Sequence, residues 1–149
     1  MRRNATESVG TLQSAHESIL AAQPKTKIWL EHGGRFMIGD GGLHLLDGIA
    51  RSGSLAEAVR EIGWSYRHAW GYLRRAESVL GAPLLLTRPG KGAARGTTLT
   101  PAGRLLLERL RALRDRIDEA LGPTGPTRDE IASRGRPRPR RRAKTTRRG

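Results

Sequence analysis

The sequence predicts a mainly α-helical domain with small β elements, and three observations lead to this fold class. Two helices, each preceded by a serine that can cap it, are separated only by Gly63-Trp64-Ser65, which is the helix-turn-helix pattern. A strand, a basic glycine-rich loop and a second strand come directly afterwards, as in a wing. A long helix closes the unit. Together they predict a winged helix-turn-helix with a leading β-hairpin and a long C-terminal helix.

Charge and composition divide the chain into three parts. Residues 134–149 carry nine of the 28 cations and no acid, so residues 1–133 keep 19 cations against 14 acids. We expect residues 1–25 to be a flexible N-terminal segment and residues 26–121 to fold. Residues 122–149 are rich in Pro, Gly and Arg, and we expect a disordered basic tail because they offer few apolar side chains to bury.

Several classes of protein are not expected from this composition. The chain has no cysteine, which argues against disulfides, thiolate zinc sites and a cysteine nucleophile. No apolar run approaches the roughly 18 residues that a membrane span needs. No histidine has a carboxylate at metal-ligand or relay spacing; the histidines are His16, His32, His44 and His68. We therefore expect a cytoplasmic protein that is not an enzyme and has no metal site, cofactor or membrane partner.

A β-hairpin is predicted at the start of the folded part. Lys27–Glu31 and Arg35–Ile38 are β-prone runs, and His32-Gly33-Gly34 forms a glycine-containing connection between them. Asp40-Gly41-Gly42 is expected to end the second strand. A first helix should come next, because apolar residues then recur at helical spacing; they are Leu45, Leu46, Ile49 and Ala50.

The next two helices are predicted from their caps. Ser54 and Glu57 have the spacing of a capping box, in which the Ser54 hydroxyl accepts from the Glu57 amide and the Glu57 side chain bonds back. This helix should end at Gly63. Ser65 should cap a third helix that runs to about Leu80. The predicted inner stripe of the third helix is Ala69, Leu73, Ala76 and Leu80.

The predicted wing and long helix complete the domain. The wing consists of Leu84–Arg88 and Thr97–Thr100 around a basic loop at residues 89–96. Thr100 should cap the long helix, with Pro101 at its first position, where the missing N–H costs nothing. An apolar seam of a/d-like spacing along this helix predicts a dimer interface. The seam residues are Leu106, Leu110, Leu113, Ile117 and Leu121.

The third helix and the wing carry the predicted nucleic-acid contacts. The first turn of such a helix can enter a major groove about 12 Å wide, where arginine can donate two hydrogen bonds to guanine. Spaced cations on a wing suit backbone or minor-groove contact. Taken alone, the helix face could also be an ordinary solvated cationic surface. The predicted DNA-binding residues are Ser54, Ser65, Tyr66, Arg67, His68, Trp70, Arg74, Arg88, Lys91 and Arg95.

The aromatic residues and one glycine of this region allow two interpretations each. Trp64 and Tyr72 are expected in the core, Tyr66 is expected in solvent, and Trp70 stays open between the two. Gly71 costs about 1 kcal/mol relative to alanine inside a helix. Close approach of DNA or close packing of a neighbouring helix would each explain it.

Several stretches closely resemble the N-terminal DNA-binding domain of molybdate-dependent transcriptional regulators, the ModE family. They are Ser52–Leu55, Ala58, Gly63–Trp70, Leu84–Arg88 with the glycine-rich wing, and Leu99–Gly103. Lys27–Ile38 resembles the leading β-hairpin of that family. The resemblance covers residues 26–121 and extends more distantly to LysR-type regulators. It implies dimeric binding to a two-fold operator, with the third helix in the groove and dimer contacts through the long helix. Full-length members of the family add a molybdate-binding module, but only 28 residues come after Leu121 here, so no small-molecule effector is expected.

These observations predict a homodimeric, sequence-specific transcriptional regulator that binds double-stranded DNA. Helix 65–80 would read the major groove, and the basic tail would add non-specific attraction to phosphates. The alternative is an RNA-binding, ribosome-associated or nucleoid-associated basic protein without operator specificity. A third possibility is an adaptor whose winged domain binds another protein.

Overall fold

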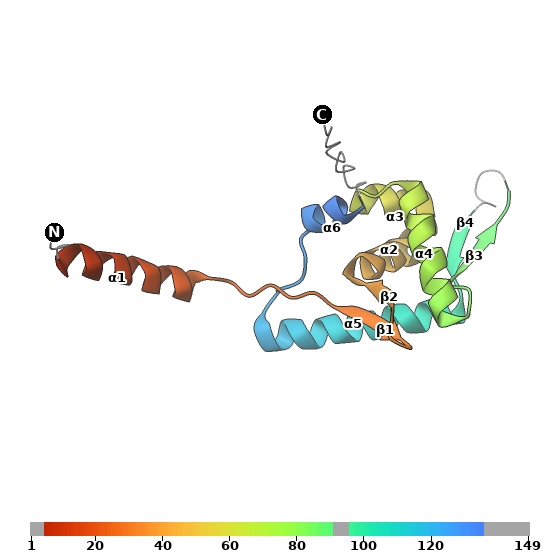
Figure 1. The fold of residues 1–149 in the computed structure, drawn as a ribbon. Coiled ribbons are helices and arrows are strands. Elements are labelled where there is room, and N and C mark those ends of the chain that lie inside the picture. Colours follow the sequence, from red (N-terminus) through yellow and green to blue (C-terminus); the bar gives the residue numbers. More distant parts are fainter. Residues whose placement is uncertain (1–4, 91–95, 136–149) are drawn as a thin grey trace, which may run out of the picture.

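The computed structural model describes residues 5–90 and 96–135 (Figure 1). Within these ranges, no helix combines the length and the apolar composition that crossing a membrane requires. The elements in chain order are α1 (Ala5–Ala21), β1 (Trp29–His32), β2 (Arg35–Gly39), α2 (Asp40–Ser52), α3 (Leu55–Ile62), α4 (Tyr66–Leu80), β3 (Leu85–Arg88), β4 (Gly96–Leu99), α5 (Pro101–Leu121) and α6 (Arg128–Arg134). The predicted fold class is confirmed: short helices, two small antiparallel hairpins and the long helix α5.

The leading hairpin and its predicted end are confirmed, because β2 ends at Gly39, directly before Asp40. Helix α2 begins at Asp40 without an intervening turn. The Asp40 amide donates to the Ile28 carbonyl at 3.1 Å, and the Asp40 carboxylate accepts from the Ile28 amide at 2.9 Å. A Cβ on Gly41 would lie 2.6 Å from the Trp64 ring, and one on Gly42 would also clash. The two glycines that come after the end of β2 therefore allow close packing of the first turn of α2.

The helix-turn-helix has its predicted caps. The Ser54 hydroxyl accepts from the Glu57 amide, and Gly63, with φ +74°, ends α3. One half of the predicted capping box is wrong, because the Ser54 amide donates to the Ser52 hydroxyl at 3.1 Å and not to the Glu57 side chain. Ser65 caps α4, as expected.

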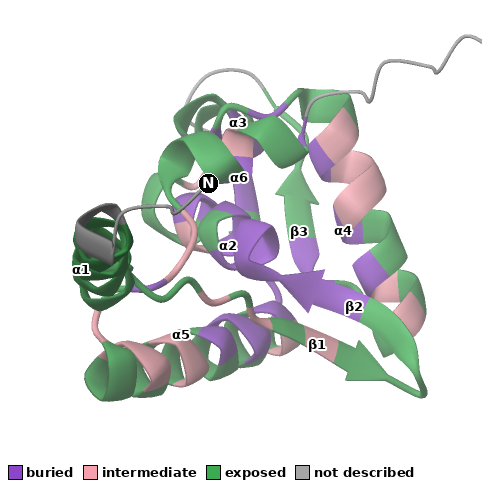
Figure 2. Ribbon diagram, turned by 60° about the vertical axis from the view of Figure 1, so that its left-hand side comes forward, coloured by how far each residue is buried: buried purple, intermediate pink, exposed green. Residues whose placement is uncertain are grey.

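The core lies between α2, α3, α4 and the first half of α5. Figure 2 shows the buried residues concentrated on α2 and on the inward sides of its neighbours, whereas α1 is exposed throughout its described side chains. The stripe of α4 is buried at Ala69, Leu73 and Ala76. Leu80 does not belong to it: this last residue of α4 is 36% exposed and lines an open groove with Leu30 and Leu105.

The wing is attached to the helix-turn-helix through its backbone. Leu85 pairs with Leu99, and Arg88 pairs with Gly96. The Thr97 amide donates to the Gly53 carbonyl at 2.9 Å, so β4 is held at the turn between α2 and α3. The predicted wing loop lies partly outside the described residues, at 91–95.

Only the outer half of the predicted α5 seam remains accessible. Leu106 and Leu110 are buried in the core of the chain itself, so they have no surface left for a partner. Leu113 and Ile117 are half-buried, and Leu121 is 54% exposed. The predicted interface must therefore be narrowed to the last turns of α5.

Two predictions for the chain ends need correction. Helix α1 occupies most of the segment expected to be flexible, residues 1–25. The folded part also extends past residue 121, since Thr127 and Glu130 form a capping box that starts α6. Ile131 of α6 is 2% exposed and joins the core. The expected disorder of residues 122–149 is therefore wrong up to residue 135, and residues 136–149 lie outside the described part.

Candidate nucleic-acid interface

The outer face of α4 is basic and free of carboxylate partners. Arg67, Arg74 and Arg75 are exposed on it, opposite the buried stripe of the same helix. Among the residues that the structure describes, no acidic side chain lies within ion-pair distance of these arginines. Their charges are therefore available to an anionic partner.

Ser54 and Ser65 lie at the N-termini of α3 and α4. The Ser65 hydroxyl accepts from the His68 amide at 3.0 Å, and the Ser54 hydroxyl accepts from the Glu57 amide at 3.2 Å. A hydroxyl that accepts still has its own proton to donate, and the helix N-terminus adds partial positive charge. Both positions can therefore donate to a phosphate oxygen while they cap their helices.

The aromatic residues around the turn divide into buried and exposed ones, as expected. Trp64 is buried and packs edge-on against Tyr72, with ring centroids 5.1 Å apart. The Tyr72 hydroxyl oxygen accepts from the Gly39 amide at 2.8 Å, and its half-buried ring packs against the core. Tyr66 is 49% exposed. The core interpretation of Trp64 and Tyr72 and the exposure of Tyr66 are confirmed.

His68 lies between the core and the surface. Its ring meets Trp64 edge-on at 4.5 Å between centroids and lies 6.3 Å from Tyr72. Burial, and then the charge of Arg75, lower the pKa of His68 below its usual value. The imidazole is therefore held in its neutral form more strongly than in a free chain, and part of it is covered by aromatic rings.

The sequence leaves open whether Trp70 is buried or exposed. In the structure it is half-buried, and the Arg74 guanidinium lies over its ring. The Arg74 guanidinium carbon lies 5.6 Å from the centroid of the Trp70 ring, and Tyr66 packs edge-on on Trp70 at 6.2 Å. A cation over a tryptophan face is attracted by the ring quadrupole. Trp70 therefore restricts where the Arg74 side chain can point.

Gly71 lies on the same face with open space beside it. A Cβ there would meet only the Arg75 Nη1 atom, at 3.6 Å, which is an ordinary contact. Among the described residues, no neighbouring helix requires a glycine at this position. The packing interpretation of Gly71 is therefore not supported by the described residues, and close approach of DNA stays a prediction.

The wing contributes Arg88, which is exposed at the end of β3. Lys91 and Arg95, the other predicted wing cations, lie outside the described residues.

Helix α6, which contributes a residue to the surface beside α4, was not predicted from the sequence. Arg134 lines a hollow of about 390 Å³ together with His68 and Tyr72 of α4. The signal that could have revealed this helix is the capping-box spacing of Thr127 and Glu130, which the Pro- and Arg-rich surroundings obscured.

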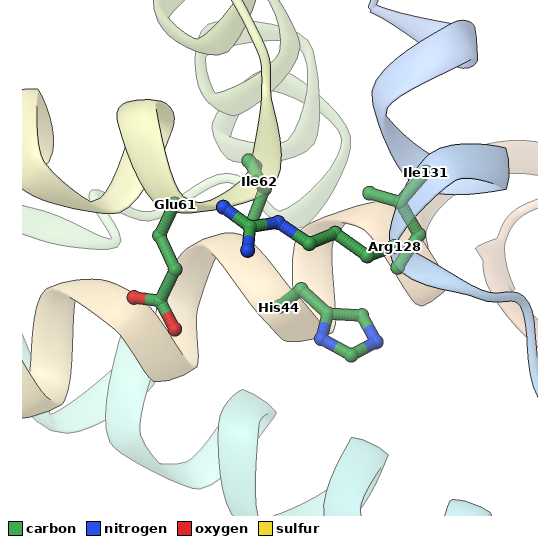
Figure 3. A pocket seen from close by; sticks show the side chains of 5 residues that line it. All are labelled: His44, Glu61, Ile62, Arg128 and Ile131. Carbon is green, nitrogen blue, oxygen red and sulfur yellow. The ribbon is translucent and has the colours of Figure 1, made fainter.

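A smaller pocket of about 180 Å³ is lined by residues of α2, α3 and α6 (Figure 3). Arg128 reaches across it from α6 toward Glu61 of α3, and His44 of α2 forms its floor. Burial lowers the pKa of His44. Within the part of the chain that the structure describes, no three histidine or acidic side chains gather as a metal site would require.

Comparison with known proteins agrees with this geometry. Residues 41–104 match the model of the family described as "Bacterial regulatory helix-turn-helix protein, lysR family". This stretch runs from the first turn of α2 to the first turn of α5. Residues 41–104 are therefore similar to the helix-turn-helix domain of LysR-type regulators. The resemblance to LysR-type regulators is thus confirmed for the part that includes α3, α4 and the wing.

Part of the chain is also similar to part of several molybdenum-related proteins. The molybdenum-pterin-binding protein MopB of Rhodobacter capsulatus is 43% identical over 63 residues, which cover 42% of this chain and 23% of MopB. MopA of the same organism is 32% identical over 93 residues, 62% of this chain and 35% of MopA. The molybdenum transport protein ModE of Herbaspirillum seropedicae is 40% identical over 77 residues, 52% of this chain and 29% of ModE. The chain thus spans about a quarter to a third of the length of these relatives.

Proposed function

We propose that this chain is a transcriptional regulator that binds double-stranded DNA sequence-specifically. The observation that carries the proposal is the basic outer face of α4, whose arginines have no carboxylate partner among the described residues, within a region that matches the LysR-type helix-turn-helix family. A helix of this kind enters the major groove with its first turns. Arg67, in the first turn and exposed, is the residue that we assign to a base edge.

The neighbouring groups are assigned to the DNA backbone. Ser65 and Ser54 would donate to phosphates from two helix N-termini. Arg74, held over Trp70, would contact a phosphate or a base farther along α4. Arg88, with Lys91 and Arg95 of the same wing, would contact the backbone or the minor groove.

We also propose that the regulator is a homodimer. The last turns of α5 expose an apolar surface that continues onto the leading hairpin, since Leu113, Ile117 and Trp29 line one shallow groove. Trp29 is largely exposed. A second copy of the chain can cover this surface symmetrically, and two-fold pairing would present two α4 helices to one face of DNA.

No molybdenum-related function is proposed for this chain. The relatives are named for molybdenum transport and for molybdenum-pterin binding, but this chain matches only about a quarter to a third of each. The helix-turn-helix match, at residues 41–104, is to the LysR family model.

The test is selection of preferred duplexes from a random-sequence library, and then a salt titration. A regulator should prefer the selected duplex over a shuffled one, and the preference should persist after added salt has weakened the non-specific term. A nucleoid- or RNA-associated basic protein would bind both duplexes alike at every salt concentration. An adaptor would bind neither strongly at physiological salt.

A further inference from the structure

The C-terminal helix α6 is attached to the turn of the helix-turn-helix. Trp64 lies in that turn, and its Nε1–H donates to the Ile131 carbonyl oxygen at 2.8 Å. Both side chains are in the core. On the other side of the turn, a Cβ on Gly63 would lie 2.8 Å from the Ala132 Cβ, which shows how closely α6 approaches. The docking is therefore built from a buried hydrogen bond and from apolar packing.

The residue that ends the described part of the chain is fixed by the same tryptophan. Gly135 is buried, and a Cβ on it would lie 2.3 Å from the Trp64 Cδ1 atom. The Trp64 ring in turn packs on His68, in the first turn of α4. Gly135, where the described part of the chain ends, therefore lies beside the N-terminal end of α4. Figure 1 shows α6 next to α3.

The sequence after Gly135 is strongly basic. Residues 136–149 include eight arginines and lysines and no acid. A chain of 14 residues can span up to about 50 Å when fully extended, and one turn of DNA rises about 34 Å. A chain that starts beside α4 can therefore reach the phosphates on either side of the base pairs that α4 would read.

We propose that α6 is an anchor that holds residues 136–149 against the DNA backbone flanking the site of α4. This inference rests on the proposed function, because it needs α4 to be docked on DNA. The fixed starting point sets a high effective concentration of cations at those phosphates. Each phosphate neutralised steepens the dependence of log K on log salt by about 0.9. The anchor thus makes a basic segment act at a defined place.

Directed cleavage of DNA tests the inference, because the chain contains no cysteine. Thr146→Cys supplies a single attachment point for an iron chelate that cuts nearby DNA. The full chain with this change is bound to the duplex selected from the random library. We expect cuts confined to a short patch next to the bases that α4 protects.

If α6 no longer docks on the helix-turn-helix, the cuts should spread over a longer stretch of DNA. Ile131→Asp places a charge in the core contact of α6, and Ser133→Asp makes the same charge change on an exposed position of the same helix. We expect dispersed or weaker cutting with Ile131→Asp and the original patch with Ser133→Asp. Circular dichroism and binding of the selected duplex report whether Ile131→Asp still folds. If it does not fold, insertion of about ten Gly/Ser residues after Gly135 should broaden the patch while α6 stays docked.

The possible failures can be told apart. An unchanged patch with released α6, or with the inserted linker, would overturn the anchor, as would an absence of cutting on a duplex that the chain binds and protects. A segment that binds RNA or an acidic protein would give this last result. If the library yields no preferred duplex, the proposed function itself fails and the anchor fails with it.

Discussion

The Tyr72 hydroxyl oxygen accepts a hydrogen bond from the backbone amide of Gly39 at 2.8 Å, which joins α4 to the end of the leading hairpin. Gly39 is buried, so Tyr72→Phe leaves a buried amide without this acceptor. Such a loss costs about 1–3 kcal/mol, and urea denaturation should show the decrease in the free energy of unfolding. Tyr66→Phe removes an exposed hydroxyl and serves as the control. Equal stability of the two variants would contradict this role of Tyr72.

Two glycine substitutions should have opposite effects on stability. Gly103→Ala would place a Cβ 2.3 Å from the Leu84 carbonyl oxygen, and this backbone clash should lower the melting temperature. Gly71→Ala meets open space on an accessible helix face, so it should raise the free energy of unfolding by up to about 1 kcal/mol. We nevertheless expect Gly71→Ala to bind the selected duplex more weakly, since its methyl group occupies the approach to DNA. Unchanged affinity would show that the glycine has no part in binding.

Acidification should destabilise the fold through its histidines. Burial lowers the pKa of His68, with help from the charge of Arg75, and burial also lowers the pKa of His44. A pKa that is lower in the folded state means that the neutral form is favoured by folding. This stability is present above the unfolded pKa of about 6.5 and is lost as the pH falls through the folded value. Urea midpoints measured between about pH 7.5 and 5 should therefore fall.

Histidine variants test which groups cause this dependence of the urea midpoint on pH. His68→Gln together with His44→Gln should flatten the dependence in this pH range, while His16→Gln, on the exposed helix α1, should leave it unchanged. If the double variant keeps the full slope, groups other than these histidines cause it.

Dimerisation should depend on the outer turns of α5. Leu113→Glu with Ile117→Glu places two charges in the half-buried groove beside the hairpin, and we expect a folded monomer with weaker binding to the selected duplex. Ala112→Glu, on an exposed position of α5, should remain dimeric. Light scattering at micromolar concentration gives the mass directly. A monomeric wild-type chain, or a dimeric double variant, would place the interface elsewhere.

The elements with strong local signals were predictable from the sequence. Ser54, Gly63 and Ser65 are sufficient to place α3, the turn and α4, because caps and left-handed glycines act within a few residues. The basic outer face of α4 could be inferred from the apolar stripe on its other side. Its dense arginines and aromatic residues therefore identify the candidate site from the sequence alone.

Contacts between distant segments could not be predicted in this way. Gly41 and Gly42 look like a strand terminator, and only the ring of Trp64 and the side chains of Ile38 and Tyr72 show why glycine is needed there. The docking of α6 depends on a hydrogen bond across 67 residues, from Trp64 to the Ile131 carbonyl. No local pattern encodes a pairing of that kind. The same reason explains why Leu106 and Leu110, regular members of a seam, face the core of their own chain.

The central claim, that α4 reads bases, is tested most directly by the affinity of Arg67→Ala for the selected duplex and for its single-base variants. Fluorescence anisotropy gives each dissociation constant, with Arg116→Ala, an exposed arginine on α5, as the control for charge. We expect Arg67→Ala to lose about 1–3 kcal/mol on the selected duplex and to become indifferent to the base at one position. The control should keep the full preference. An equal loss on selected and shuffled duplexes, with discrimination intact at every position, would contradict base reading by Arg67.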